Sequence, residues 1–117
     1  MKDKIEFKEL LDIEKKLEIK IGTITKVERM EGSDKMLKLS VDFGEDGSKV
    51  SMTNIGNLDG FSKEGEAEEK LTDVQMPFIT NLVPSKMMGV ESEAMILPVQ
   101  NGKELEFESF TNGAKLM

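Results

Sequence analysis

The sequence predicts an all-β fold: a small barrel of five strands, preceded by one helix and followed by a β extension. Over residues 17–30, apolar and polar residues alternate almost without a break, which predicts one long strand. Further short apolar runs follow, separated by turns rich in Gly, Asp and Asn. The chain has 117 residues, which is enough for one domain.

The segment before the long strand predicts a helix over residues 5–16. Phe7, Leu10 and Leu11 fall on one stripe of such a helix, and charged residues occupy the rest of its surface. The period then changes to two, with Leu17 and its alternate neighbours on one face of a strand. The alternation slips near Gly22, which predicts a bulge or bend where the strand passes from one part of the sheet to another.

The remaining runs predict shorter strands. Pro77 lacks a backbone donor, so the strand that contains it is expected at a sheet edge or at a bulge. Residues 56–72 are rich in Gly and Glu and predict a loop with one helical turn. The predicted strands cover residues 36–43, 49–55, 74–80, 94–99 and 105–110.

A long bent first strand followed by short strands favours a five-stranded Greek-key barrel, the OB-fold, with a β-sandwich as the alternative. We expect a single domain, with the helix in residues 1–16, the barrel in 17–99 and a C-terminal extension in 100–117. No apolar run is long enough to span a bilayer, and the first residues lack the apolar core segment of a signal peptide, so a cytoplasmic location is expected.

Composition excludes several kinds of site. The chain has no Cys and no His, which excludes thiolate and imidazole metal sites and the Ser-His-Asp and Cys-His nucleophiles. Composition leaves carboxylate chemistry and hard-cation binding open, but the acidic run of residues 64–69 lacks the Asp/Asn and Gly pattern of a calcium loop, and nothing marks a water-excluding pocket around Glu91 and Glu93. We therefore expect no enzyme activity, no metal and no cofactor. The net charge of −7 argues against a general polyanion binder. Without Trp or Tyr, stacking on nucleobases would depend on Phe or on Arg29.

The most informative stretch is N-L-V-P-S-K-M-M-G-V-E-S-E-A-M, residues 81–95. It lies between two predicted strands. Gly89 permits a tight bend, and Lys86 offers a cation on a loop stiffened by proline. Asn81 and Ser92 offer neutral hydrogen-bonding groups. This combination predicts a binding loop.

That stretch resembles the N-L-x-P-x-K-x-x-G-x-x-S-x-[GA]-M signature of the EMAP II-like tRNA-binding domain family. Other segments are similar to the family as well: L-E-I-K-I-G-T-I at 17–24, S-D-K-M-L at 33–37 and N-G-A-K-L at 112–116. The resemblance covers residues 17 to 117. The family includes free-standing dimeric tRNA-binding proteins and the C-terminal domain of methionyl-tRNA synthetases.

The resemblance implies an OB-fold that binds tRNA by its structure and dimerises through a C-terminal extension. It implies partners in tRNA, a second copy of the chain and an aminoacyl-tRNA synthetase. The expected dimer interface combines the N-terminal helix with Leu105, Phe107, Phe110 and Leu116. The implied tRNA-binding residues are Lys20, Lys35, Asn81, Lys86, Ser92 and Met95.

Other interpretations remain open. A secretion-related chaperone family shares this fold and the V-D-F-G sequence of residues 41–44, and its members bind polypeptide instead of RNA. Asn81 fits a backbone-capping role as well as an RNA contact. A core poor in aromatic residues predicts methionines as gap fillers, so we expect Met36, Met52, Met76 and Met88 inside.

Charge along the chain predicts where RNA would bind. Cations concentrate between Lys4 and Lys38, so the first two strands are expected to present a positive stripe. Acidic residues concentrate in residues 64–69 and 104–108, which would repel phosphate. We therefore expect weak binding, confined to one face and sensitive to salt.

Overall fold

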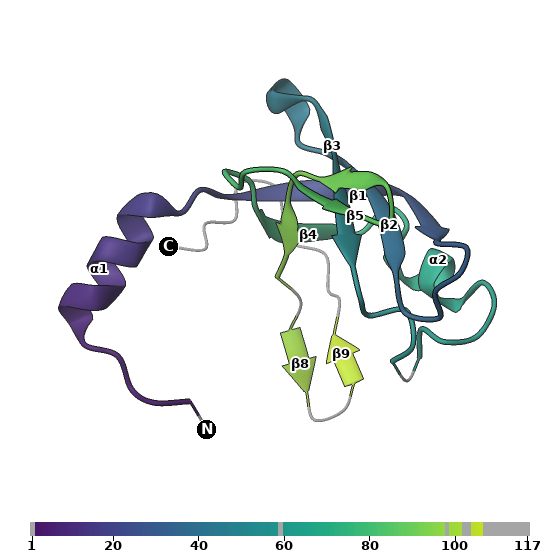
Figure 1. The fold of residues 1–117 in the computed structure, drawn as a ribbon, viewed down its shortest axis with the longest axis horizontal. Coiled ribbons are helices and arrows are strands. Elements are labelled where there is room, and N and C mark those ends of the chain that lie inside the picture. The colour runs from purple at the N-terminus through teal and green to yellow at the C-terminus, as the bar shows by residue number, and fades with distance from the viewer. Residues whose placement is uncertain (1, 59, 98, 102–103, 107–117) are drawn as a thin grey trace.

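A curled antiparallel sheet in the order β3-β2-β1-β4-β7 forms the body of the molecule (Figure 1). The structure is a computed structural model that describes residues 2–58, 60–97, 99–101 and 104–106. A helix, α1 (Phe7–Lys16), precedes the sheet, as predicted. The sheet strands are β1 (Ile19–Arg29), β2 (Leu37–Asp42), β3 (Ser48–Thr53), β4 (Gln75–Ile79) and β7 (Met95–Ile96).

The smaller elements connect or extend this sheet. A short 3-10 helix, η1 (Gly44–Asp46), joins β2 to β3, and α2 (Glu66–Leu71) lies between β3 and β4. Two hairpins follow: β5 (Ser85–Met87) with β6 (Val90–Ser92), and β8 (Val99–Asn101) with β9 (Glu104–Glu106).

The bend in β1 lets one strand serve both halves of the sheet. Residues 19–23 pair with β4 and residues 23–29 pair with β2, with a register shift between Ile24 and Lys26. The predicted bend is therefore present, slightly after Gly22. A Cβ at Gly22 would lie 2.5 Å from Val41 Cγ1 and 2.6 Å from the ring of Phe43. Glycine thus allows the close packing that the curl requires.

Contacts between β3 and residues 92–94 close the sheet. The Ser51 hydroxyl donates to the Ala94 carbonyl at 2.8 Å, and the Glu93 N–H donates to the Val50 carbonyl at 2.8 Å. The result is an OB-like barrel rather than a sandwich, as the bent first strand predicts.

The core follows the alternation in the sequence. Leu37, Leu39 and Val41 are fully buried on one face of β2. Beside them lie Ile24 of β1 and Phe78 of β4, both also fully buried. The segment predicted as a loop with one helical turn forms α2, whose buried side chains are Ala67 and Leu71.

The position of Pro77 differs from the prediction. Pro77 is buried in β4, opposite Ile21 of β1, and β4 lies inside the sheet between β1 and β7. The Pro77 carbonyl accepts from Leu97 N–H at 2.9 Å, so its missing donor also faces β7. Since β7 spans only Met95–Ile96, the absent donor lies near the end of that short partner and interrupts no long ladder.

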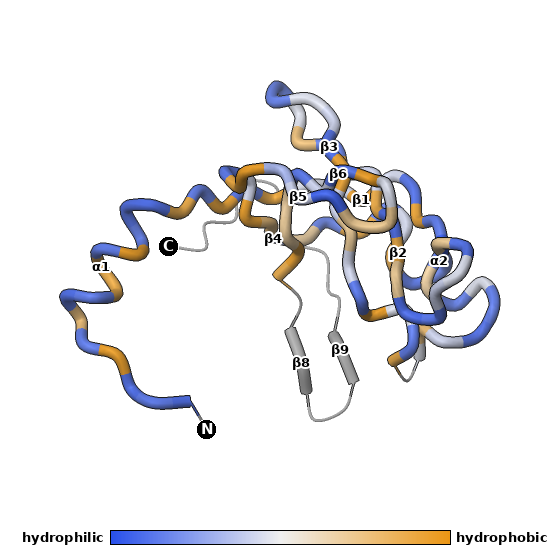
Figure 2. Tube along the Cα trace, viewed as in Figure 1, coloured by the Kyte–Doolittle hydropathy of each residue, from blue (hydrophilic) through white to orange (hydrophobic). Residues whose placement is uncertain are grey.

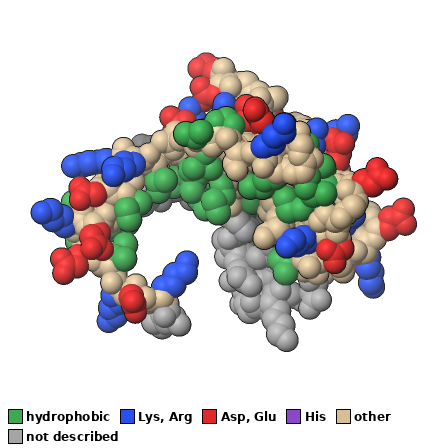
Figure 3. Space-filling model, in the orientation of Figure 1, with side chains coloured by type: hydrophobic (Ala, Val, Ile, Leu, Met, Phe, Trp, Pro, Cys, Tyr) green, Lys and Arg blue, Asp and Glu red, His purple; other side chains and the backbone are tan. Residues whose placement is uncertain are grey.

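The helix α1 projects from the end of the barrel opposite α2 (Figure 1). None of its residues is buried, and the ring of Phe7 is 73% exposed. Figure 3 shows hydrophobic side chains gathered on the side of α1 that faces the body of the molecule. Within the described residues, no helix is long and apolar enough to cross a membrane.

Candidate functional site

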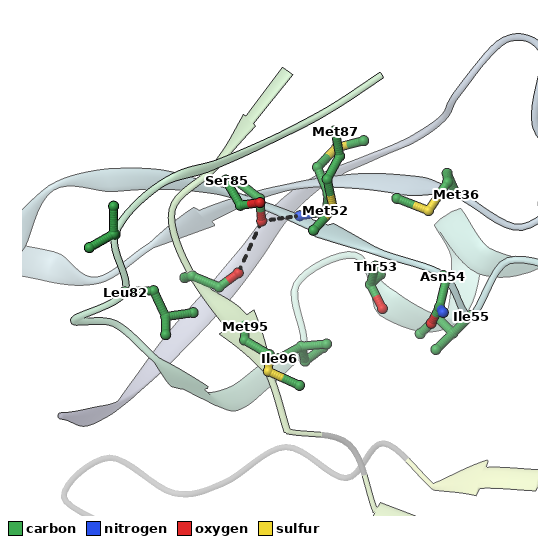
Figure 4. Close-up of a pocket in the computed structure, with 13 residues that line it drawn as sticks. Met36, Met52, Thr53, Asn54, Ile55, Leu82, Ser85, Met87, Met95 and Ile96 are labelled. Carbon is green, nitrogen blue, oxygen red and sulfur yellow. Dashed lines mark hydrogen bonds between the residues drawn. The ribbon is translucent and has the colours of Figure 1, made fainter. Parts of the chain in front are cut away.

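An uncharged groove of about 560 Å³ lies on the barrel, beside β3 and beneath the β5–β6 hairpin (Figure 4). The turn before β2 contributes one wall, and the segment from Leu82 to Ile96 contributes another. No lining residue carries a charge, although a third of the chain does. The lining residues are Met36, Met52, Thr53, Asn54, Ile55, Leu82, Val83, Ser85, Met87, Ser92, Ala94, Met95 and Ile96.

Methionines from separate segments dominate this groove. Met36, Met52, Met87 and Met95 all line it, and the last two side chains are 37% and 54% exposed. Thioether side chains are polarizable and adaptable, and they make favourable contacts with aromatic rings. The groove therefore offers a soft apolar surface to a ligand.

The predicted burial of the methionines is only partly right. Met76 is in the core and Met52 is 7% exposed, whereas Met88 is 48% exposed and Met36 is half-buried in the groove wall. Sequence reasoning missed Met36, Met52 and Met87 as site residues. The available signal was that Met36 and Met87 each follow a lysine at the edge of a loop.

The β5–β6 hairpin covers the groove, and its position is fixed by a tight turn and by hydrogen bonds to the barrel. Met88 and Gly89 form its turn with φ of 51° and 81°, the left-handed pair that a tight two-residue turn requires. The Ser92 hydroxyl then ties the hairpin to the barrel. It accepts from the Met52 N–H at 3.0 Å and donates to the Ala94 carbonyl at 3.3 Å (Figure 4).

Asn81 anchors the start of the same segment. Its side-chain oxygen accepts from the Glu18 N–H at 2.8 Å, and its amide donates to the Lys16 carbonyl at 2.6 Å. The Thr80 N–H adds a bond to the Glu18 carbonyl at 2.9 Å. The predicted binding residue Asn81 thus uses both of its polar atoms to join the loop to the end of α1.

Two predicted lysines are adjacent in sequence to groove residues but do not line the groove, and neither forms an ion pair among the described residues; Lys86 lies opposite Glu91 in the β5–β6 ladder. Lys35 and Lys86 are exposed, and each precedes a groove methionine, Met36 or Met87. The Lys35 carbonyl accepts from the Gly56 N–H at 2.7 Å, which fixes that turn beside β3.

Lys20 has a different environment. It forms ion pairs with Asp46 and, at 3.6 Å, with Glu18. The hydrogen bond to Asp46 is the main cause that raises the pKa of Lys20 above its ordinary value. Lys26 is also paired, with Glu28 at 3.5 Å. The expected positive stripe on the first strand is therefore largely neutralised, and Lys20 does not line the groove.

Aromatic stacking groups are absent from the groove walls. The rings of Phe61 and Phe78 are buried in the core, and Phe7 lies on α1. The Arg29 guanidinium donates to the carbonyls of Gly56 at 2.8 Å and Phe61 at 2.6 Å, so it braces loops. In the described part of the chain, methionine thus replaces the Phe or Arg29 platform that composition suggests.

A family model places these features in context. The model tRNA_bind, described as "Putative tRNA binding domain", matches residues 19–116. The chain belongs to this tRNA-binding domain family. The matched range contains the groove, Lys35, Lys86 and the loop that Asn81 anchors, and the family is one of binding modules.

Known proteins place the chain among relatives of methionyl-tRNA synthetase. A methionine–tRNA ligase of Methanococcoides burtonii is 40% identical over 82 residues, which are 70% of this chain and 11% of that protein. The chain spans between 11% and 14% of the length of this and other curated methionine–tRNA ligases that it matches.

Two crystal structures share the fold. A MetRS-related protein from Pyrococcus horikoshii superposes with a TM-score of 0.73 at 24% identity, covering 97% of this chain and 94% of that one. The CsaA chaperone protein of Picrophilus torridus gives 0.69 at 21% identity, with 96% and 94% covered.

Proposed function

We propose that the chain is a non-catalytic tRNA-binding module and that the methionine-lined groove is its RNA site. The observation that carries this proposal is an uncharged groove in a chain with a net charge of −7, where the lining residues Met36 and Met87 each follow an exposed lysine that has no ion pair within the described part of the chain. Acidic proteins attract RNA only where the local surface departs from the average charge. The groove with Lys35 and Lys86 is such a place.

The proposed contacts divide between bases and backbone. An unstacked base from a loop or an end of tRNA would pack against the thioethers of Met87 and Met95, because sulfur packs well on aromatic rings. Lys35 and Lys86 would pair with phosphates on either side. Few phosphate contacts give modest affinity that falls with salt.

A tRNA titration tests this proposal. Fluorescence anisotropy with labelled total tRNA should show binding at low salt, and Lys35→Glu and Lys86→Glu should each weaken it and reduce the salt slope by about 1. Lys63→Glu is the matched control, because it makes the same charge change on an exposed lysine outside the groove. Wild-type protein that fails to bind tRNA at low salt contradicts the proposal.

We also propose a homodimer, with the N-terminal helix and the C-terminal extension of residues 100–117 at its interface. The apolar stripe of α1 supports this, because Phe7, Leu10 and Leu11 are 73%, 39% and 37% exposed. Uncovered stripes of this kind usually mark a protein interface. Phe107, Phe110 and Leu116 lie outside the described residues. Sedimentation should give twice the 13.1 kDa chain mass at micromolar concentration.

A second candidate function is binding of an unfolded polypeptide. The neutral, apolar lining of the groove favours it, since methionine-rich surfaces adapt to varied apolar side chains. If the groove serves peptides, the protein should suppress aggregation of a denatured client and an apolar peptide should displace bound dye from the groove. If it serves RNA, tRNA should displace the dye instead.

The proposed cellular setting is the cytoplasm, with an aminoacyl-tRNA synthetase as a partner. The methionine–tRNA ligases that this chain resembles support that partner, because each of them contains a segment similar to it. Co-purification of a synthetase with the tagged protein would support this partner. Recovery of the homodimer alone would argue against it.

A further inference from the structure

We propose that Met87 and Met95 form an oxidation-sensitive site: a peroxide converts their thioethers to sulfoxides, and this lowers the affinity of the groove for its ligand. The effect on RNA rests on the proposed function, whereas the oxidation site itself does not.

Composition directs oxidation to methionine. The chain has no Cys, Trp, Tyr or His, so its nine methionines are the side chains that a mild peroxide oxidises readily. Four of them, Met36, Met52, Met87 and Met95, line one groove. Oxidation of this protein therefore includes the site that we propose for binding.

Exposure selects two of the four. Met95 is 54% exposed and Met87 is 37% exposed, whereas Met36 is half-buried and Met52 is 7% exposed. The core residue Met76, outside the groove, is 1% exposed. Peroxide reaches sulfur according to its accessibility, so Met87 and Met95 should react well before the core does. Neither residue belongs to the buried core, so the barrel should remain folded after both are oxidised.

The reaction is a two-electron oxygen transfer. The sulfur lone pair attacks one peroxide oxygen, the O–O bond breaks, an S–O bond forms and the peroxide leaves as an alcohol, or as water from hydrogen peroxide. Sulfur is oxidised and the peroxide is reduced. A methionine sulfoxide reductase, with a thiol as reductant, removes the oxygen as water and restores the thioether.

Oxidation to the sulfoxide changes the polarity of the groove. A sulfoxide is polar and accepts hydrogen bonds, whereas the thioether is apolar and packs on rings. The groove walls around Met95 are otherwise apolar or neutral, and no charged residue lines them to offset the new dipole. An aromatic base or an apolar dye should therefore bind less well after oxidation.

The test treats the full chain with hydrogen peroxide and maps oxidation by peptide mass spectrometry. Met87 and Met95 should gain oxygen while Met76 remains unmodified, and tRNA affinity should fall about tenfold. A methionine sulfoxide reductase with dithiothreitol should restore it. Untreated wild-type protein tests the proposed function separately. If it does not bind tRNA, the proposed function is wrong, but the oxidation site is still tested by the dye described below.

Leucine variants separate this site from general damage. Met87→Leu/Met95→Leu keeps the groove apolar and cannot be oxidised there, so its binding should survive peroxide. Met88→Leu is the control, because Met88 is 48% exposed on the same hairpin but does not line the groove. After peroxide treatment, the Met88→Leu variant should lose tRNA affinity to the same extent as wild type.

A second readout uses an apolar fluorescent dye, anilinonaphthalene sulfonate, in place of tRNA. Its binding should fall with oxidation of wild type and persist in the double leucine variant. Undiminished ligand binding after Met87 and Met95 are oxidised would overturn the proposal, as would equal losses in wild type and the double variant.

Discussion

Two apolar surfaces of the molecule differ in shape and chemistry. The large hydrophobic residues that are exposed in the described chain all fall within residues 5–17 or 82–95. The first set lies on and beside α1, where hydrophobic and hydrophilic residues alternate along the chain (Figure 2). Side chains of both charges accompany these hydrophobic residues on α1 (Figure 3). The second borders a hollow that is rich in methionine and lined by no charged residue. An exposed stripe of branched side chains suits a protein partner, and a soft hollow whose methionines follow exposed lysines suits RNA.

One residue connects the two surfaces. Asn81 binds the last turn of α1 through the Lys16 carbonyl and begins the segment that forms the groove wall. The orientation of α1 and the position of the loop are therefore set at one junction. The two surfaces should nevertheless respond separately to substitutions placed at their centres.

The largest expected effect comes from charging the helix. Leu10→Asp/Leu11→Asp should convert the proposed dimer into a monomer, because the two leucines that this dimer would bury contribute enough to weaken dimerisation by at least about 100-fold. Sedimentation velocity measures the change. Lys8→Gln/Lys16→Gln adds the same two negative units on the polar side and should leave the dimer intact. Equal dissociation in both variants would show that charge alone, not the stripe, controls assembly.

Removing the hydroxyl that holds the hairpin should affect stability. Ser92→Ala leaves the buried Met52 N–H without its acceptor, at a cost of about 1 to 3 kcal/mol in unfolding free energy. Urea denaturation gives the value. Ser85→Ala on the same hairpin is the control, since Ser85 is exposed. An unchanged midpoint for Ser92→Ala would mean that the hydroxyl does not support the barrel.

A smaller loss is expected at the junction. Asn81→Ala removes the acceptor of the Glu18 N–H and the donor to the Lys16 carbonyl, both reachable by water, so we expect a loss of about 1 kcal/mol. Asn57→Ala, another exposed asparagine, should change the unfolding free energy by less than about 0.5 kcal/mol. Equal changes in unfolding free energy for the two variants would show that the Asn81 side chain does not stabilise the junction between α1 and the loop.

The smallest effect concerns Lys20. Asp46→Asn removes the main ion-pair partner of Lys20 and leaves this lysine free to contact RNA. The tRNA affinity should therefore rise about twofold to threefold, and the salt slope should grow by up to about 1. The pair raises the pKa of Lys20 above its ordinary value, and an unpaired lysine is itself protonated at neutral pH, so Lys20 carries its charge in both the wild type and the variant. The gain should therefore be constant between about pH 6 and pH 9. A gain confined to one end of that range would implicate another group.

The fold was largely predictable because local alternation and tertiary burial agree. The alternation predicts that Leu37, Leu39 and Val41 share one face of a strand, and all three are fully buried in the structure. Pro77 was misplaced because a sequence pattern does not show which neighbour a missing donor faces, or that β7 is so short.

The site was less predictable, because its chemistry depends on distant segments. Lys20 looks like a free outward cation, and only the curl of the barrel brings Asp46 against it. Methionine is equally suited to core and groove, so Met36 and Met88 could not be placed from residue type. The loop motif, in contrast, located Ser92 and Met95 at the groove directly.

The most direct test of the central claim compares two methionines of one segment. Met95→Glu places a carboxylate in the groove, and Met88→Glu makes the same change at a residue of similar exposure, 48% against 54%, outside it. In a tRNA titration, Met95→Glu should weaken binding at least about 100-fold, because like charges brought together cost several kcal/mol, while Met88→Glu stays within about threefold of wild type. Equal affinities for the two variants would contradict the assignment of the groove as the RNA site.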